Sequence, residues 1–312
     1  MEKGNRFKKV LLGLLIASFV IGSVAFLMVN QLKTSGLEIK YEAAENGLML
    51  AKYNGTSADK ALRIPDTAAD ESGKQQPVTE LGEFALSNSA YLEELHIGAN
   101  VAKIHVWAIS NCERLSKITV DGNNQYFSAR DGVLYSKDMR ELLVYPNMAF
   151  YDFEMDETGE AVRDEDKNRV VLESEKNGTF TIPEGVKIIG ENAFYKCGKL
   201  NSIVFAPSVR EVREKAFFKC KGLKALTLGT GFAAIGVDAF AFCDSVEGEI
   251  RIPAGVKTIG QYAFFSNSSK VARVLVDARE DAIDLGENWL PNKKGSRGKT
   301  VDCSFTENGE GA

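Results

Sequence analysis

Apolar positions recur along this chain in one phrase that is repeated six times. Each copy begins with an apolar residue, usually followed by Gly. Four residues after the first position come an Ala and then a large apolar residue. A small Cys, Ser or Asn follows three residues after the large one. The copies begin at Leu81, Ile104, Ile189, Val212, Ile235 and Ile259. Consecutive copies are 23 or 24 residues apart, except for one interval of 85. A fixed period in this range predicts a stack of repeats, in which each unit buries its apolar side against the next.

A second apolar pattern begins three residues after the Cys position of each repeat. It has the form L-x-x-L-x-L, as in Leu200, Ile203 and Phe205. Its last two apolar positions alternate, which predicts a short strand with one buried face, and stacked copies would form a parallel sheet. The segment from Glu191 to Cys197 and its equivalents is predicted to form a short helical turn. We therefore predict an α/β solenoid of short parallel strands and short helical turns.

The first thirty residues have a different pattern. Val10 to Val29 is a run of twenty residues without a charge, and Lys3, Arg6, Lys8 and Lys9 precede it. Twenty residues at helical rise span a bilayer, and a basic flank stays on the cytoplasmic side. The pattern predicts one transmembrane helix that acts as a signal anchor, with the repeats extracellular. Cleavage after the small residues at Ser23-Val24-Ala25, and secretion, is the alternative.

These patterns divide the chain into five parts. We predict a cytoplasmic basic tail at 1–9, the anchor at 10–30, a linker with N-terminal cap strands at 31–77, the solenoid at 78–277, and a C-terminal cap and tail at 278–312. The long interval between repeats contains an acidic insertion at 147–178, which is predicted to be a hairpin that projects from the stack. Insertions in solenoids lie in surface loops, which often bind partners.

The repeats resemble those of a known family. The phrases Ile182-Pro183-Glu184-Gly185-Val186 through Cys197, and Ile252-Pro253-Ala254-Gly255-Val256 through Asn267, are similar to the BspA-type leucine-rich repeat. The resemblance covers residues 37–277 and implies a right-handed leucine-rich-repeat coil in a bacterial surface or secreted protein with a role in adhesion or recognition. The insertion, and Trp107 and His105 in the second repeat, depart from the pattern, so no specific partner carries over.

The five cysteines fit the repeat better than a disulfide framework. Cys112, Cys197, Cys220 and Cys243 share one repeat position, with Ser89 and Asn267 in the other copies. Equivalent residues of stacked coils are separated by about 4.8 Å, which is wider than the Cβ separation of a disulfide. We expect buried free thiols that fill apolar space. Cys303 lies outside the repeat, and the sequence leaves its state open.

Composition and motifs argue against nucleic-acid binding and catalysis. The 312 residues are 44% hydrophobic with a formal net charge of −5, and no basic clusters are interleaved with aromatics. We therefore predict no nucleic-acid partner. The only histidines are His96 and His105, without a metal or nucleophile motif around them. We predict no enzyme, catalytic residue, cofactor or metal site; Asp164, Asp166 and Asn168 match part of a calcium loop, but Arg169 stands where that loop needs Gly.

Two stripes are candidate binding surfaces for a protein or a glycan. The turn-side stripe consists of aromatic residues that follow the core Phe of successive repeats by one or two positions. They are Tyr195, Phe218, Phe242 and Phe265. These rings either contact a partner or pack against the neighbouring coil. On the strand side the candidates are the outward residues His96, Thr119, Val204, Thr227, Arg251 and Leu275.

The sequence thus favours a non-enzymatic, membrane-anchored extracellular protein that recognises a protein or glycan at a bacterial cell surface. The alternative is a structural scaffold of the cell envelope that acts by self-association. An enzyme that uses the acidic insertion, with a metal, is the third hypothesis.

Overall fold

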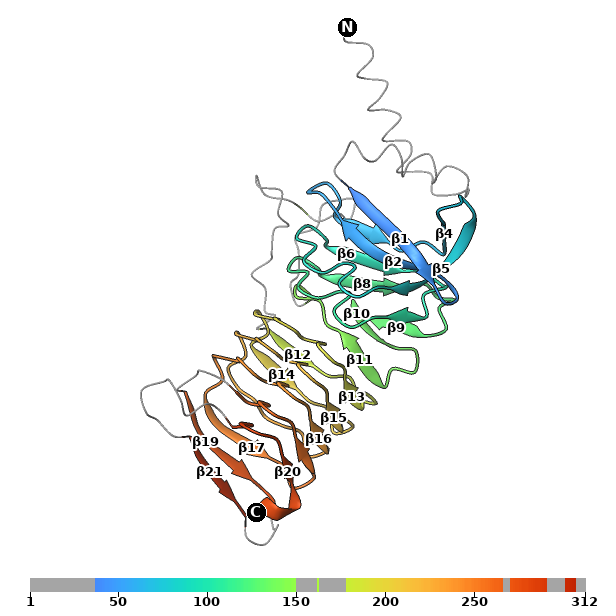
Figure 1. Cartoon of the computed structure of the whole chain (residues 1–312). Helices are drawn as coiled ribbons and strands as arrows, with labels where there is room; N and C mark the ends of the chain where they lie inside the picture. The colour runs from blue at the N-terminus through green and yellow to red at the C-terminus, as the bar shows by residue number, and fades with distance from the viewer. Residues whose placement is uncertain (1–36, 150–161, 163–177, 266–269, 291–300, 307–312) are drawn as a thin grey trace.

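The computed structural model describes residues 37–149, 162, 178–265, 270–290 and 301–306. Coils stack along one axis from the N-terminal hairpin to the C-terminal strands (Figure 1). Within the described ranges no helix is both long and apolar enough to cross a membrane. The anchor predicted at 10–30 and most of the acidic insertion lie outside these ranges.

The N-terminal part begins with an antiparallel hairpin of β1 (Glu38–Ala44) and β2 (Gly47–Asn54). Parallel pairing continues from β2 to β5 (Gln75–Leu81) and then to β7 (Lys103–Ile104), while β4 (Thr67–Ala69) is antiparallel to β5. A second parallel sheet consists of β3 (Ala61–Arg63), β6 (Glu94–Ile97) and β8 (Lys117–Val120). One buried core, which includes Leu50, Leu81, Leu86 and Leu95, belongs to this part.

The C-terminal part is organised around an eight-stranded sheet. Its first three strands, β9 (Phe127–Arg130), β10 (Val133–Ser136) and β11 (Glu141–Val144), are antiparallel. Five two-residue strands follow in parallel, and they are β13 (Ile188–Ile189), β15 (Glu211–Val212), β16 (Ala234–Ile235), β18 (Thr258–Ile259) and β20 (Asp284–Leu285). The other strands of this part are β12 (Thr179–Thr181), β14 (Ser202–Val204), β17 (Gly248–Ile252), β19 (Val271–Val276) and β21 (Asp302–Phe305).

Most of the strands predicted from the L-x-x-L-x-L pattern are present. The pattern corresponds to β6, β8, β14, β17 and β19, and β21 closes the last sheet by pairing with β19. The copy at Leu223, Leu226 and Leu228 is the exception. Its three side chains are buried as predicted, but the segment is not a strand.

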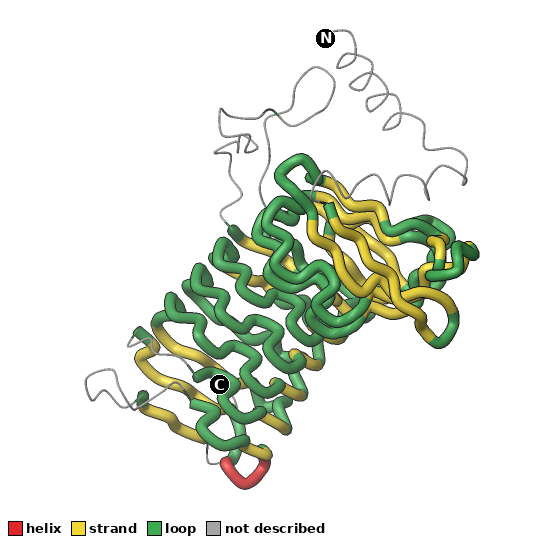
Figure 2. The backbone as a smooth tube through the Cα atoms, turned by 45° about the horizontal axis from the view of Figure 1, so that its top comes forward, coloured by secondary structure: helices red, strands yellow, loops and turns green. Residues whose placement is uncertain are grey.

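The predicted helical turns are wrong. Residues 191–197 and their equivalents form consecutive tight turns (Figure 2), and the described residues contain only one helical segment, a 3-10 turn at Glu280–Ala282. Alternate N–H groups bond within the turn, as Cys197 does to Phe194, and across to the next coil, as Phe194 does to Ala216. In an α-helix the backbone bonds run along the axis from residue i to i−4, so the alternation of bonds within the turn and bonds to the next coil would be lost.

The core of the C-terminal part is a ladder of stacked rings. Successive centroids of Phe194, Phe217, Phe240 and Phe264 are 4.6, 5.0 and 5.4 Å apart. Tyr145, 4.7 Å from Phe194, extends the ladder at its N-terminal end. Offset or tilted ring pairs of this kind add to the free energy gained from burial, so each coil is stabilised by its two neighbours.

The cysteines at the repeat position are buried free thiols, as the register predicts. The thiols of Cys220 and Cys243 donate to the carbonyls of Phe194 and Phe217, at 3.0 and 3.2 Å. Burial raises the pKa of Cys112 to about 12, and it also raises the pKa of Cys197 and of Cys220. These groups therefore serve packing and are poor nucleophiles.

Candidate functional site

The aromatic residues of the turn side form one continuous row, which we call the aromatic ridge. Its members are Phe84, Trp107, Tyr195, Phe218, Phe242 and Phe265. From Tyr195 onward the centroids of successive rings are 5.6, 5.2 and 5.4 Å apart, the first pair stacked and the others edge to face. Trp107 lies edge to face with Tyr195 at 4.8 Å, and Phe84 stacks on Trp107 at 6.4 Å.

The rings pack against neighbouring coils, as one of the two interpretations of the sequence predicts, and contact with a partner stays a prediction. The rings of Tyr195, Phe218, Phe242 and Phe265 pack on one another, yet all four remain partly exposed. Cations lie over them: Lys196 over Tyr195 at 5.3 Å, and Lys219 over Phe218 at 5.3 Å. The ridge is therefore a partly solvated, preformed apolar surface with positive charge beside it.

Sequence reasoning missed Phe84 and Trp107 as members of the ridge. They stand immediately before the repeat Ala, at a position whose backbone is left-handed in every coil, with φ of 58° and 67°. Asn and Asp tolerate that conformation better than bulky residues do, and Asn192 and Asp238 occupy it elsewhere. An aromatic residue at this position was the signal that could have identified them.

The strand-side candidates are distributed over three separate sheets and one segment outside the strands. His96 and Thr119 are register neighbours on β6 and β8 and share a hydrogen bond of 3.0 Å, while Arg251 and Leu275 are neighbours on β17 and β19. Val204, 48% exposed, pairs with Thr181 in the two-stranded sheet of β12 and β14. Thr227 lies outside any strand. The guanidinium of Arg251 is already 2.7 Å from Asp277.

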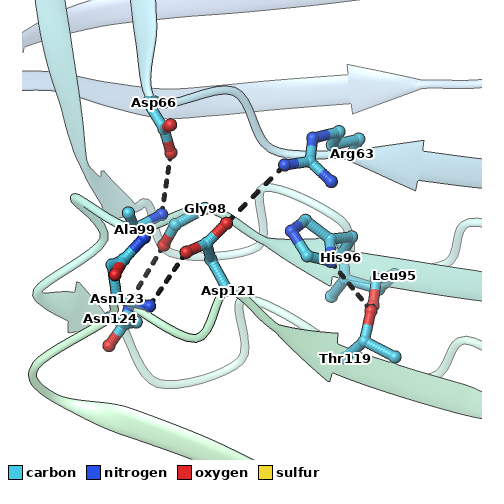
Figure 3. A network of polar contacts seen from close by, with 10 residues as sticks. All are labelled: Arg63, Asp66, Leu95, His96, Gly98, Ala99, Thr119, Asp121, Asn123 and Asn124. Carbon is cyan, nitrogen blue, oxygen red and sulfur yellow. Dashed lines mark hydrogen bonds and ion pairs between the residues drawn. The ribbon is translucent and has the colours of Figure 1, made fainter.

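The polar residues around His96 have structural partners (Figure 3). Arg63 lies 3.8 Å from Asp121, whose carboxylate also accepts the N–H of Asn123 at 2.9 Å. The amide of Asn124, fully buried, donates to Gly98 and Val101 and accepts from Tyr126 and Phe127. Burial, followed by the charge of Arg63, lowers the pKa of His96. This cluster holds loops together.

The repeat is interrupted between residues 104–112 and 141–147, a boundary that we call the seam. The register would pair Ile109 with Ala193, as Phe194 pairs with Ala216, but the carbonyl of Ala193 accepts from Tyr145 instead. A partly open cavity of about 280 Å³ lies at the seam, and its lining includes His105, Trp107, Phe127, Glu141, Glu191 and Arg213.

The cavity lining carries several charges. Arg213 donates to Glu141 at 2.7 Å and to Glu211 at 3.1 Å. Burial raises the pKa of Glu141 in spite of Arg213, and burial together with Glu214 raises the pKa of Glu191. Nε2 of His105 lies 2.6 Å from Oε2 of Glu80. Both His105 and Arg213 occupy the Gly position of their repeat.

Within the ranges that the structure describes, no three His, Cys, Asp or Glu side chains are grouped as metal ligands would be. The partial calcium pattern at 164–175 lies outside those ranges.

Comparison with known proteins identifies the repeats. Residues 73–147 and 171–283, more than half of the chain, match in six copies a family model described as BspA type leucine rich repeat region. No curated protein matches the chain in a sequence comparison.

Three solved structures match the chain, and only the first has a TM-score above 0.5. The pneumococcal vaccine antigen PcpA has 13% identity and a TM-score of 0.53, with 88% of this chain and 87% of that chain covered. A leucine-rich repeat protein from Eubacterium ventriosum has 19% identity, a TM-score of 0.43, and coverage of 71% and 66%. One from Bacteroides ovatus has 16% identity, a TM-score of 0.42, and coverage of 93% and 76%. At these identities the likeness concerns the fold alone.

Proposed function

Since the chain belongs to the BspA-type leucine-rich-repeat family, we propose that it is a non-enzymatic recognition module, anchored in the membrane by residues 10–30 and displayed outside a bacterial cell. Its ligand is a protein or a glycan, and the aromatic ridge is the surface that binds it. The observation that carries this proposal is the ridge itself, a row of partly exposed rings held in register by a rigid stack.

Physical reasons favour the ridge over the strand side. Aromatic side chains contribute much of the binding energy at protein interfaces because they bury a large area at little cost in conformational entropy. The rings are also ordered before binding, since each packs against the next. The strand-side candidates are divided among separate sheets.

A binding panel tests the proposal. The full chain in detergent is applied to immobilised glycans and purified extracellular proteins, together with Phe218→Ser, Tyr195→Ser and the strand-side control Val204→Ser. We expect at least one ligand whose affinity falls about tenfold or more in the ridge variants and is unchanged in the control. Thermal unfolding of each variant separates lost contact from lost fold.

Two results would contradict the proposal. Equal binding by the ridge variants and the wild type would exclude the ridge as the contact surface. Concentration-dependent assembly of the chain that the ridge variants abolish, without any ligand on the panel, would favour the scaffold role.

The location is tested separately. Protease added to intact cells should remove the repeats and leave a membrane-bound fragment that contains residues 10–30. Protection of the repeats in intact cells, or release of an undigested soluble chain that lacks residues 1–25, would contradict the anchored form.

A further inference from the structure

The backbone pairing between coils is incomplete at the seam. Leu86 and Asn88 donate to the carbonyls of Ala108 and Ser110 in the next coil, and the same two bonds recur from Phe194 and Lys196, from Phe217 and Lys219, and from Phe240 and Phe242. Ile109 and Asn111 hold the same positions, and among the described residues their N–H groups have no such carbonyl partner. In the same part of the chain, β7 pairs only with β5. The seam therefore contains an edge strand beside a cavity.

The size of the cavity limits what it can hold. Pockets for drug-sized ligands have volumes of roughly 300–1,000 Å³, and this cavity has about 280 Å³. A folded element or an oligosaccharide would not enter it. A single long side chain of a partner would.

The charges at the cavity favour a cation. Arg213 is shared between the carboxylates of Glu141 and Glu211. Glu191 forms no ion pair with a Lys or Arg among the described residues, and its recorded hydrogen bond, from Asn192, is long at 3.5 Å. Burial is the main cause that raises the pKa of Glu141 and of Glu191, and Glu214 adds to it at Glu191, so a positive group beside them would stabilise their ionised forms.

The aromatic lining favours the same kind of group. Trp107 and Phe127 contribute to the cavity, and a ring face attracts Lys or Arg cations. The molecule already uses this pairing elsewhere, where Lys219 lies over Phe218 and Phe242, and Lys60 and Arg114 lie over Tyr91.

We propose that the cavity at the seam binds the side chain of a Lys or Arg residue of a partner protein, with Glu191 and Glu141 as its acceptors and Trp107 as its aromatic contact. This inference rests on the proposed recognition role and specifies its ligand: a protein with an exposed basic residue that enters beside the N-terminal end of the aromatic ridge.

Short peptides test the proposal by calorimetric titration of the full chain. The probes are Ac-Gly-Arg-Gly-NH2, Ac-Gly-Lys-Gly-NH2 and the neutral Ac-Gly-Gln-Gly-NH2. We expect the basic peptides to bind and the neutral peptide not to bind. Glu191→Gln and Trp107→Ala should each weaken binding about tenfold. Glu184→Gln, an exposed carboxylate outside the cavity lining, should leave it unchanged.

The pH dependence supplies a second readout. Cation binding needs ionised carboxylates, so it should weaken on acidification, and the raised pKa values place the loss at higher pH than for ordinary glutamates. Glu191→Gln should flatten this profile.

Several results would overturn the proposal. They are equal binding of the neutral peptide, no binding of the basic peptides, and an unchanged affinity in Glu191→Gln. Methylguanidinium that binds as tightly as the Arg peptide would assign the cavity to free small cations instead of a protein. If the cavity tests fail while ridge variants still lose their ligand on the panel, the recognition role stands without this site.

Discussion

The two parts of the molecule achieve stacking by different means. In the C-terminal part, Phe occupies the core position of four consecutive coils and the rings form a ladder. In the N-terminal part that position holds Leu86 and Ile109, and buried polar residues such as Asn124 and Glu93 fix the loops. A regular repeat is thus sufficient to stabilise the stack where neighbouring coils have the same core residue. Where the core residues differ, individual polar contacts hold the coils together. At the seam between the two parts, the backbone hydrogen bonding between coils is incomplete.

The largest expected effect comes from breaking the ring ladder. Phe217 is fully buried between Phe194 and Phe240, so Phe217→Ala should lower the free energy of unfolding by about 3–5 kcal/mol. Leu86→Ala, at the same position of the N-terminal part, should cost less because it removes fewer ring contacts. Denaturant unfolding of the full chain measures both. A larger loss for Leu86→Ala would contradict the contrast between the two parts.

The polar contacts of the N-terminal part should be next in magnitude. Asn124→Ala removes four hydrogen bonds of a fully buried amide. Backbone groups left unpaired in the interior cost free energy, so we expect a loss of about 3 kcal/mol. The neighbouring exposed residue gives the control, Asn123→Ala, which should have little effect. A loss of equal size in both variants would show that the loop, not the buried amide, is sensitive.

The buried thiols should make the free energy of unfolding depend on pH. The folded state raises the pKa of Cys220 above its ordinary value of 9.0, so its contribution is complete below that pH and is lost as pH rises further. The slope for one such group is about 1.4 kcal/mol per pH unit. Unfolding measured at increasing alkaline pH should give a flatter curve for Cys220→Ala than for the wild type. For Cys112→Ala the difference should stop growing near pH 12, where the folded thiol ionises.

The smallest effect concerns the left-handed aromatic residues of the N-terminal part. Phe84 is 55% exposed and has a φ of 58°, and a left-handed conformation costs most residues about 1–2 kcal/mol. Phe84→Asn should therefore raise the free energy of unfolding slightly, by about 0.5 kcal/mol. Val106→Asn, also exposed but without a positive φ, should give no gain in the same unfolding experiment. Loss of stability in Phe84→Asn would mean that its ring contact with Trp107 outweighs the backbone cost.

Much of the fold could be predicted because it depends on the spacing of apolar residues along the chain. The period, the buried Cys position and most strands follow from which residues must face inward. The turns could not be predicted correctly, because the bonds that shape Glu191 to Cys197 are made to the next coil, which is another segment of the chain. Of the site, Tyr195, Phe218, Phe242 and Phe265 could be found by register. Phe84 and Trp107 stand at another repeat position, before the Ala, and their membership depends on the left-handed backbone there, so only the aromatic residue at that position pointed to them.

The sequence by itself determined that this chain stacks repeats and which side of each repeat is buried, since burial follows the periodicity of apolar residues. Only the tertiary structure decided how the long interval between repeats is accommodated. Tyr145 takes the hydrogen bond that the register would have given to Ile109, and this exchange leaves the cavity beside Trp107. Such an exchange depends on competition between segments that are distant in sequence, and no local pattern records its outcome.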